Sequence, residues 1–347
     1  MTTKAVERPS AQLSQETLLD MFWMMLLARR TDERAWVLHR QGKIAFHASG
    51  IGHEGAQVGA AFAINRGVDY VYPYYRDLAL SISLGVTPLD YLMSTFGKKG
   101  EYSSGGKQMP CHYSVKASNI VSGSSVVATQ VPQAAGTAFA IKYRQETGLV
   151  DRADVTQPRL ALTCLGEGST SQGEWHEGMN WAGVHQLPFI CLVQNNLYAI
   201  SVPVDQQMAV PNVADRAAAY GMKGVMVDGN DMLAVYDVMK AAVERAYNGD
   251  GPTLVEAKTY RTVPHSSDDD DRSYRSREEV EEWKLKDPIT RFQQYLTDEG
   301  ILTPDALDDY QQRAKAQVDA ATQAAEAAPW PDIEELYTGV YAPLEEA

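Results

Sequence analysis

The sequence predicts an α/β protein built on a doubly wound, mostly parallel β-sheet that is flanked by helices. Residues 160–165, 189–193, 224–229 and 252–261 are apolar runs typical of buried strands. Helical stretches separate these runs, and such alternation indicates a parallel sheet covered on both faces. Ligands bind beyond the carboxyl ends of the strands in sheets of this kind. We therefore expect a functional site where polar residues follow the strands.

The amino-terminal part is expected to begin with a flexible polar arm, residues 1–13. Acidic residues and apolar residues at helical spacing predict a helix from Ser14. After a turn at residues 41–42, a second helix should begin near His53 and Glu54. We expect both of these side chains to act as a helix cap.

A short strand should end at Pro73, and the sequence Tyr74-Tyr75-Arg76-Asp77 follows it. Arginine is the side chain best shaped to hold a phosphate group through two hydrogen bonds. The residues alone leave two interpretations open. Arg76 binds an anion, or it forms an ion pair with Asp77 on the surface.

Residues 97–118 form a long, polar, glycine-rich stretch. Loops of this length without structure of their own are usually functional or mobile. His112 has no nearby partner for a metal site, so a structural hydrogen bond is its expected role. Residues 122–131 predict only another loop, and small residues on the helix after Pro132 would allow close helix packing.

The most informative stretch is residues 165–203, where two polar turns follow two strands. A Gly-Glu-Gly turn centred on Glu167 ends the first strand, and an Asn-Asn pair ending at Asn196 ends the second. Together with the Tyr198 carbonyl, these residues offer oxygen atoms, the ligands that Mg²⁺ prefers. The glycines would let backbone N–H groups approach a diphosphate at a helix start. The alternative is a plain strand–helix–strand unit whose Asn-Asn pair is only a turn.

Several helix boundaries can be predicted from local signals. Ser171 and Glu174 have the spacing of a capping box, so a helix should begin there. Gly221 should close a helix that starts near Asn212, and Asn230 should cap the next one.

Residues 262–277 are polar and charged, with four successive aspartates at positions 268–271. Because like charges repel, we expect a solvated, mobile loop unless neighbouring arginines fold onto the aspartates. The arginines able to do so are Arg261, Arg272, Arg275 and Arg277. Three helical stretches follow, from residues 277, 288 and 303, and then a carboxyl-terminal tail, residues 331–347.

The composition argues against several functional classes. The net charge of −14 argues against nucleic acid or an anionic membrane as the main partner. Cys164 and Cys191 lie inside apolar runs and should be reduced core residues, as in a cytoplasmic protein. No apolar run approaches about 18 residues, so no membrane span is expected. Ser171 stands where the nicotinamide-binding G-x-G-x-x-G motif needs glycine, which argues against NAD binding.

The stretch from Leu165 to Pro203 resembles the thiamin-diphosphate motif, which begins Gly-Asp-Gly and ends in Asn-Asn. Its Leu-Pro and Asn-Asn-x-Tyr-Ala-Ile-Ser sequences are similar to those of 2-oxo-acid dehydrogenase alpha subunits, decarboxylating component. The branched-chain (2-oxoisovalerate) branch is the most similar, and the resemblance extends over residues 15–340. Glu167 stands where the general motif has aspartate and reaches about 1.5 Å further. Some branched-chain members carry the same glutamate.

This resemblance implies the thiamin-diphosphate-binding fold and the oxidative decarboxylation of branched-chain 2-oxo acids. The acyl group would pass reductively to the lipoyl group of an acyltransferase component. Thiamin diphosphate and Mg²⁺ would be the cofactors, with a K⁺ site as in branched-chain members, and a beta subunit would complete an α₂β₂ enzyme. Two alternatives remain: a pyruvate or acetoin dehydrogenase alpha subunit and, more distantly, a non-catalytic α/β scaffold.

The resemblance also implies how the chain is organised. A single thiamin-diphosphate-binding domain, residues 14–330, would contain an active-site loop at 262–277 and a helical part at 278–330. In that loop, His265 would be the catalytic residue and Ser266 the regulatory serine of the family.

Further residues are assigned by their place in the family's motifs. Cofactor contacts are implied for Tyr74, Tyr75, Arg76, Ser125, Val127, Gly166, Glu167, Gly168, Ser169, Asn196, Tyr198, Ala199, Ile200 and His265. Substrate contacts are implied for Phe46, Tyr75, Met109 and Ser125. Mg²⁺ ligation is implied for Glu167, Asn196 and Tyr198, and K⁺ ligation for Ser124, Val126, Thr129 and Gln130.

Overall fold

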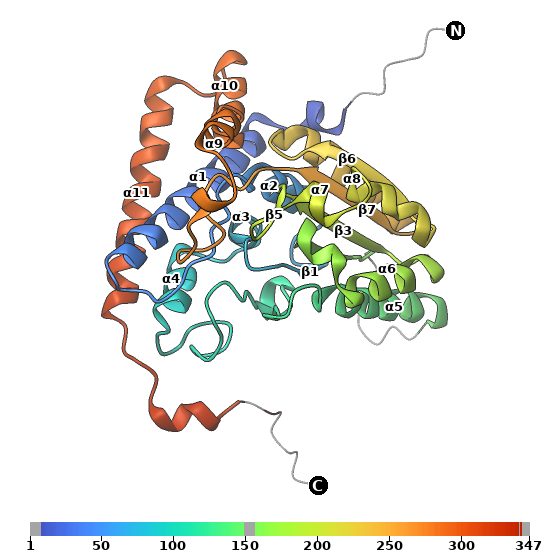
Figure 1. Cartoon of the computed structure of the whole chain (residues 1–347), viewed down its shortest axis with the longest axis horizontal. Helices are drawn as coiled ribbons and strands as arrows, with labels where there is room; N and C mark the ends of the chain where they lie inside the picture. The colour runs from blue at the N-terminus through green and yellow to red at the C-terminus, as the bar shows by residue number, and fades with distance from the viewer. Residues whose placement is uncertain (1–7, 149–156, 340, 342–347) are drawn as a thin grey trace.

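The computed structural model describes residues 8–148, 157–339 and 341, which form an α/β architecture (Figure 1). Five parallel strands make one sheet in the order β1-β2-β3-β7-β6. These strands are β1 (Tyr70–Tyr72), β2 (Ala161–Gly166), β3 (Phe189–Asn195), β6 (Lys223–Asp228) and β7 (Thr253–Lys258). A short antiparallel pair, β4 (Tyr198–Ala199) and β5 (Val202–Pro203), follows β3. The predicted parallel, doubly wound sheet is therefore confirmed.

Helices cover both faces of the sheet because successive strand residues point to opposite sides. In β2, Leu162 and Cys164 enter one apolar core, whereas Ala161 and Leu165 enter the other. The first core includes side chains from α1 (Gln15–Arg40), α2 (Glu54–Ala63), α3 (Leu78–Ser83), α4 (Pro88–Phe96), α8 (Met232–Asn248), α10 (Pro288–Asp298) and α11 (Pro304–Ala327). The second includes side chains from α5 (Gln130–Thr147) and α6 (Gly173–Val184).

Shorter elements lie in the connections between these helices and strands. They are α7 (Val204–Gln207), α9 (Arg277–Lys284) and the 3₁₀ helices η1 (Pro9–Gln12), η2 (Lys116–Ser118), η4 (Glu167–Ser171), η5 (Val213–Tyr220), η6 (Asp271–Ser273) and η7 (Ile333–Tyr337). The long helix α11 packs against α1 and α4 at one side of the molecule (Figure 1).

Several predicted helix ends are confirmed by their capping contacts. The Ser14 hydroxyl accepts the Thr17 N–H at the start of α1, and Asp287 and Thr303 cap α10 and α11 in the same way. Such caps satisfy backbone N–H groups that have no partner inside the helix. Gly221, at φ 63°, ends η5 as predicted, although this segment is a 3₁₀ helix.

The predicted capping box at Ser171 and Glu174 is wrong. Residues 167–171 form η4, so α6 begins only at Gly173 and its cap position is Gln172. The Ser171 hydroxyl accepts a hydrogen bond from Gln207 instead. A contact from a distant segment has therefore replaced the local cap.

Two other predicted caps are also wrong. Asp231 rather than Asn230 caps α8, because its carboxylate accepts the Ala234 N–H at 3.1 Å. His53 precedes α2 but makes no capping hydrogen bond. Glu54 is the first residue of α2, and its carboxylate accepts the N–H of Gly52, which precedes the helix, at 2.8 Å.

The 262–277 segment folds around its own charges. Arg272 pairs with Asp270, and Arg275 pairs with Asp271. These contacts offset the repulsion between the aspartates, as the sequence allows. Arg261 and Arg277 depart from this expectation, since neither has an ion pair with the aspartates in the described part of the chain. Arg261 donates to the Ile200 carbonyl instead, and Arg277 starts α9.

The ends of the chain are described only in part. Ser10 donates its N–H and its hydroxyl to the Asp237 carboxylate, at 2.7 and 2.8 Å, so residues 8–13 of the predicted arm are anchored. Residues 1–7 of that arm, and 340 and 342–347 of the predicted tail, lie outside the described residues. The boundaries of the single domain stay a prediction.

Cys164 and Cys191 are buried and free, as predicted, and so is Cys111. Among the helices of the described residues, none is both long and apolar enough to cross a membrane.

A buried carboxylate attaches α1 to the segment before α2. Asp32 Oδ1 lies 2.8 Å from His47 Nε2 and 2.7 Å from the Ser49 hydroxyl, and Oδ2 accepts the Gly50 N–H at 2.8 Å. Burial alone would lower the pKa of His47, but the Asp32 carboxylate raises it to about 9. The pair is therefore ionised at neutral pH and fixes the backbone on either side of Ala48.

We expect Asp32→Ala to lower the free energy of unfolding by about 3–5 kcal/mol, because it removes the buried partner of His47, the Ser49 hydroxyl and the Gly50 N–H together. Asp309→Ala is the matched control, since it removes only an exposed ion pair with Arg313 and should cost less than about 1 kcal/mol. Urea unfolding of the purified chain, followed by circular dichroism, measures both. A small and equal effect of the two substitutions would contradict the structural role of the buried pair.

Candidate functional site

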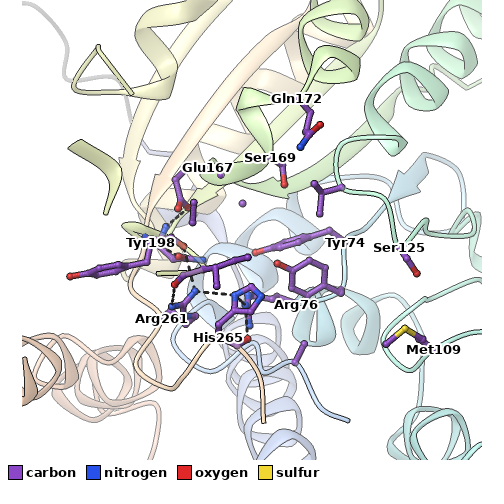
Figure 2. Close-up of a pocket in the computed structure, with 18 of the residues that line it drawn as sticks. Tyr74, Arg76, Met109, Ser125, Glu167, Ser169, Gln172, Tyr198, Arg261 and His265 are labelled. Atoms are coloured by element: carbon purple, nitrogen blue, oxygen red, sulfur yellow. Dashed lines mark hydrogen bonds between the residues drawn. The ribbon is translucent and has the colours of Figure 1, made fainter. Parts of the chain in front are cut away.

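A cavity of about 460 Å³ lies at the carboxyl ends of β2 and β3 (Figure 2). The two strands are parallel neighbours, so the polar turns that follow them meet at the same edge of the sheet. The cavity is lined by Phe46, Ala48, Tyr74, Tyr75, Arg76, Met109, Pro110, His112, Ser125, Val127, Gly166, Glu167, Gly168, Ser169, Gln172, Asn196, Tyr198, Ala199, Ile200, Arg261 and His265. Every residue predicted to contact the cofactor or the substrate lies among them.

Glu167 brings a buried carboxylate to this cavity. Its Oε2 accepts the Asn196 N–H at 3.0 Å, whereas Oε1 is buried with no hydrogen-bond partner among the described residues. Burial raises the pKa of Glu167. Leaving such an oxygen unsatisfied costs stability, and a bound divalent cation would satisfy it.

The turn that carries Glu167 is held in one conformation. A Cβ atom at Gly168 would lie 2.7 Å from Ala199 Cβ, so only glycine lets this turn approach β4 so closely. The Gln207 amide donates to the Glu167 carbonyl at 3.0 Å and to the Ser171 hydroxyl at 2.9 Å. The carboxylate therefore projects from a fixed backbone.

The segment after Asn196 has an unusual backbone. Leu197 and Ile200 have φ angles of 73° and 58°, which non-glycine residues rarely adopt. The carbonyls of Tyr198 and Ile200 accept hydrogen bonds from Arg261, at 3.4 and 2.6 Å. Within the described residues, the Tyr198 carbonyl, a predicted metal ligand, thus accepts only this long hydrogen bond.

Two buried arginines dominate the charge of the cavity. Arg76 and Arg261 are each 1 % exposed. Arg76 donates to the carbonyls of Ser49 and His265, both at 2.8 Å. Neither arginine forms an ion pair with a carboxylate in residues 8–148 and 157–339. Burial and the charge of Arg76 lower the pKa of Arg261. Buried charge without a counter-ion is costly, so this arrangement favours a bound anion.

His265 lies between these two guanidinium groups (Figure 2). Its Nδ1 is 3.0 Å from Arg76 Nη2 and 3.2 Å from Arg261 Nη1. Guanidinium groups can only donate, so Nδ1 accepts and the neutral ring carries its hydrogen on Nε2. Burial and the two arginine charges lower the pKa of His265 to about 3. The ring is therefore neutral at physiological pH and offers an N–H donor to the cavity.

The alternative of a surface ion pair between Arg76 and Asp77 is wrong. Arg76 is buried, and Asp77 instead accepts the Tyr74 N–H at 2.9 Å and the Gln194 amide at 2.6 Å. Burial raises the pKa of Asp77 to about 7. Asp77 thus holds the backbone at Tyr74 beside the cavity.

The side of the cavity away from Glu167 and Tyr198 is largely apolar. Met109 and Ser125 lie away from Glu167 and Tyr198 (Figure 2), and Phe46 adds apolar surface to the lining. The cavity thus has a charged region, with Glu167, Arg76 and Arg261, and a largely apolar region, with Phe46, Met109 and Ser125.

Five lining residues were not assigned to the site from the sequence: Ala48, Pro110, His112, Gln172 and Arg261. His112 makes the structural hydrogen bonds expected of it, to the Met109 carbonyl at 2.9 Å and to the Ser125 hydroxyl at 2.8 Å. Arg261 could have been predicted from the sequence. It follows β7, the parallel neighbour of β3, at the carboxyl edge of the sheet where ligands bind. Nothing local distinguished His112 or Gln172, because their positions depend on the paths of loops.

The predicted K⁺ ligands lie beside the cavity rather than in its lining. The Ser124 hydroxyl accepts the Val126 N–H at 3.1 Å, and the Val126 carbonyl accepts the Thr129 N–H at 3.4 Å. The Gln130 side chain donates to the Cys164 carbonyl at 2.9 Å. The four residues share the turn that leads into α5, and K⁺ binding stays a prediction.

The residues present fit a diphosphate bridged to a divalent cation. Glu167 has an unsatisfied oxygen, and the two arginines lack acidic partners among the described residues. No group of three or more His, Cys, Asp or Glu side chains that could hold a metal occurs within those residues. A cation at Glu167 would therefore need further oxygen atoms, which a diphosphate supplies.

Comparison with known proteins agrees with this geometry. The chain is 49% identical over 330 residues to the 2-oxoisovalerate dehydrogenase subunit alpha of Bacillus subtilis, covering 95% of this chain and 97% of the relative. It is 38% identical over 343 residues to the 3-methyl-2-oxobutanoate dehydrogenase subunit alpha of Mycobacterium tuberculosis, covering 99% and 88%.

A less similar relative is named for a different substrate, pyruvate. The pyruvate dehydrogenase E1 component subunit alpha of Staphylococcus aureus is 36% identical over 315 residues, covering 90% of this chain and 79% of the relative. Residues 23–334 match the family model described as the dehydrogenase E1 component. The resemblance found in the sequence is confirmed, and the chain belongs to the dehydrogenase E1 component family.

Proposed function

We propose that this chain is the α subunit of a thiamin-diphosphate-dependent dehydrogenase that decarboxylates branched-chain 2-oxo acids. The acyl group would pass to the lipoyl group of an acyltransferase component. One observation carries the proposal: a buried acid with an unsatisfied oxygen lies in the same cavity as two buried arginines that lack acidic partners among the described residues. That arrangement supports a catalytic subunit over a non-catalytic scaffold.

The charged region would hold the cofactor. Glu167, Asn196 and the Tyr198 carbonyl would bind Mg²⁺, and Arg76 with the backbone around Gly168 would bind the diphosphate. When bound, thiamin diphosphate supplies a nucleophilic carbon and an electron sink for the decarboxylation. The metal and the arginines would neutralise the diphosphate, whose charge is otherwise unfavourable in a buried site.

His265 would act as a hydrogen-bond donor toward the reacting acid. Its Nδ1 is occupied by the two guanidinium groups, so Nε2–H is the group left to face an oxygen of the substrate. A pKa of about 3 makes the ring a poor proton acceptor at neutral pH. Negative charge from a bound diphosphate would raise this pKa and allow the ring to hold a proton.

The largely apolar region would select the substrate. Phe46 and Met109 offer apolar surface to the side chain of a 2-oxo acid, and Tyr75 and Ser125 offer hydroxyl groups nearby. The relatives named for branched-chain acids, at 49% and 38% identity, support this class over pyruvate, at 36%. A pyruvate or acetoin dehydrogenase remains the alternative.

A partner would close the cavity. Met109 and Ile200 line it yet are 53 % and 58 % exposed, so part of the lining is uncovered in the isolated chain. We assign this role to a beta subunit in an α₂β₂ enzyme of the cytoplasm. The lipoyl-bearing acyltransferase would reach the same opening.

Asn196→Ala should abolish Mg²⁺-dependent binding of thiamin diphosphate, because it removes the neutral oxygen ligand of the proposed metal. Titration calorimetry on the purified α₂β₂ complex measures the affinity directly. Asn212→Ala is the matched control, since the Asn212 side chain lies outside the cavity lining and donates to the exposed Asp215 carboxylate at 3.1 Å. Wild-type affinity in a folded Asn196→Ala complex would remove the metal site from this account.

The specificity constant should be higher for 2-oxoisovalerate than for pyruvate. Each additional buried CH₂ group contributes about 0.8 kcal/mol, so two extra carbons give roughly a 15-fold advantage. Steady-state kinetics of the reconstituted complex measure the ratio. Met109→Ala should reduce it, whereas Leu285→Ala, at an exposed position outside the lining, should leave it unchanged. Equal or reversed constants would favour the pyruvate alternative.

A further inference from the structure

His53 is a fully buried histidine with no role in the function proposed above. It directly precedes α2, is 0 % exposed and makes no capping hydrogen bond. Its Nε2 lies 3.2 Å from Asn196 Nδ2, across 143 positions of sequence. A buried imidazole therefore contacts the side chain that would supply the neutral ligand of the metal.

Hydrogen-bond chemistry decides which end of the Asn196 amide faces His53. The other end, Oδ1, lies 3.3 Å from the Tyr198 N–H. A backbone N–H can only donate, so the oxygen must lie on that side and the NH₂ group must face the imidazole. His53 Nε2 therefore accepts a hydrogen bond from Asn196, and the ring hydrogen of His53 is on Nδ1.

The backbone that carries His53 has little freedom to move. A Cβ atom at Gly52 would lie 2.4 Å from the Tyr260 carbonyl oxygen, which shows how closely the two segments approach. The Gly52 N–H is bound by Glu54 Oε2 at 2.8 Å, and Glu54 Oε1 pairs with Arg29 at 2.5 Å. The acceptor at His53 is therefore held at a fixed place relative to Asn196.

We propose that His53 is a positioning residue for the metal site, whose Nε2 fixes the amide of Asn196 so that the oxygen is kept for a divalent cation. This inference rests on the proposed function and adds a residue to it. Without an acceptor at position 53, the amide can turn over and present its NH₂ group, which cannot bind a cation. Groups that orient a metal ligand in this way typically contribute about 10–100-fold in metal affinity.

The test compares three substitutions at position 53 in the α₂β₂ complex. His53→Gln places an amide oxygen near the position of Nε2, His53→Asn is too short to do so, and His53→Leu removes hydrogen bonding. Mn²⁺ is the probe, and electron paramagnetic resonance counts free and bound ion in the presence of thiamin diphosphate. We expect Kd for Mn²⁺ to rise about 10–100-fold for Leu and Asn, and to stay within about threefold of wild type for Gln. If His53→Leu fails to fold, His53→Asn carries the test.

Two further substitutions separate this inference from the proposed function. His185→Leu, on a histidine that contacts Phe139 and Trp181 away from the cavity lining, should leave Kd unchanged. Asn196→Ala should raise it in any case. Wild-type Kd in His53→Leu and His53→Asn, with a loss in Asn196→Ala, would overturn the role of His53 and leave the metal site standing. Equal losses in the Gln, Asn and Leu variants would also overturn it. Wild-type Kd in Asn196→Ala would reject the metal site itself.

Discussion

The buried positive charge of Arg76 and Arg261, which have no acidic partner within residues 8–148 and 157–339, is the constraint on which the rest of the site depends. Arg76 and Arg261 each donate to backbone carbonyls, so they hold in place the segments at Ser49, His265 and Ile200. Burial and these charges lower the pKa of both His53 and His265 to about 3. A polyanion would offset this charge, which connects the folding of the chain to the ligand that we propose.

The parallel sheet explains why so few elements suffice to build the site. Glu167 follows β2, Asn196 follows β3 and Arg261 follows β7, and these strands are direct neighbours. Their carboxyl ends therefore bring a carboxylate, an amide and a guanidinium group to one edge of the sheet. Helix α1 supports the site indirectly. Its Asp32 side chain binds His47 and the Gly50 N–H and so fixes Ala48, which lines the cavity. Each functional group thus projects from backbone that the core already holds.

The sequence predicts most of the sheet and the centre of the site for a physical reason. Buried strands need continuous apolar runs, and parallel strands place polar residues at one edge, so Glu167 and Asn196 could be found from pattern alone. Arg76 was assigned to the site only through the family resemblance, since the local sequence by itself favoured a surface ion pair with Asp77. The contact of His53 with Asn196 and the cap at Gln172 could not be predicted, because partners distant in the sequence determine both.

The most direct test of this account is the pKa of His265 with and without cofactor. Histidine labelled with ¹³C in the α₂β₂ complex allows a titration by NMR, with His265→Gln used to assign the signal. We predict a neutral ring down to a pH of about 3 to 4 in the cofactor-free complex, since burial and two arginines disfavour the imidazolium. Thiamin diphosphate with Mg²⁺ should raise the pKa by about one unit or more, because nearby negative charge favours the protonated ring. An unchanged His265 pKa in the cofactor-loaded complex would contradict the claim that a diphosphate binds beside the buried arginines.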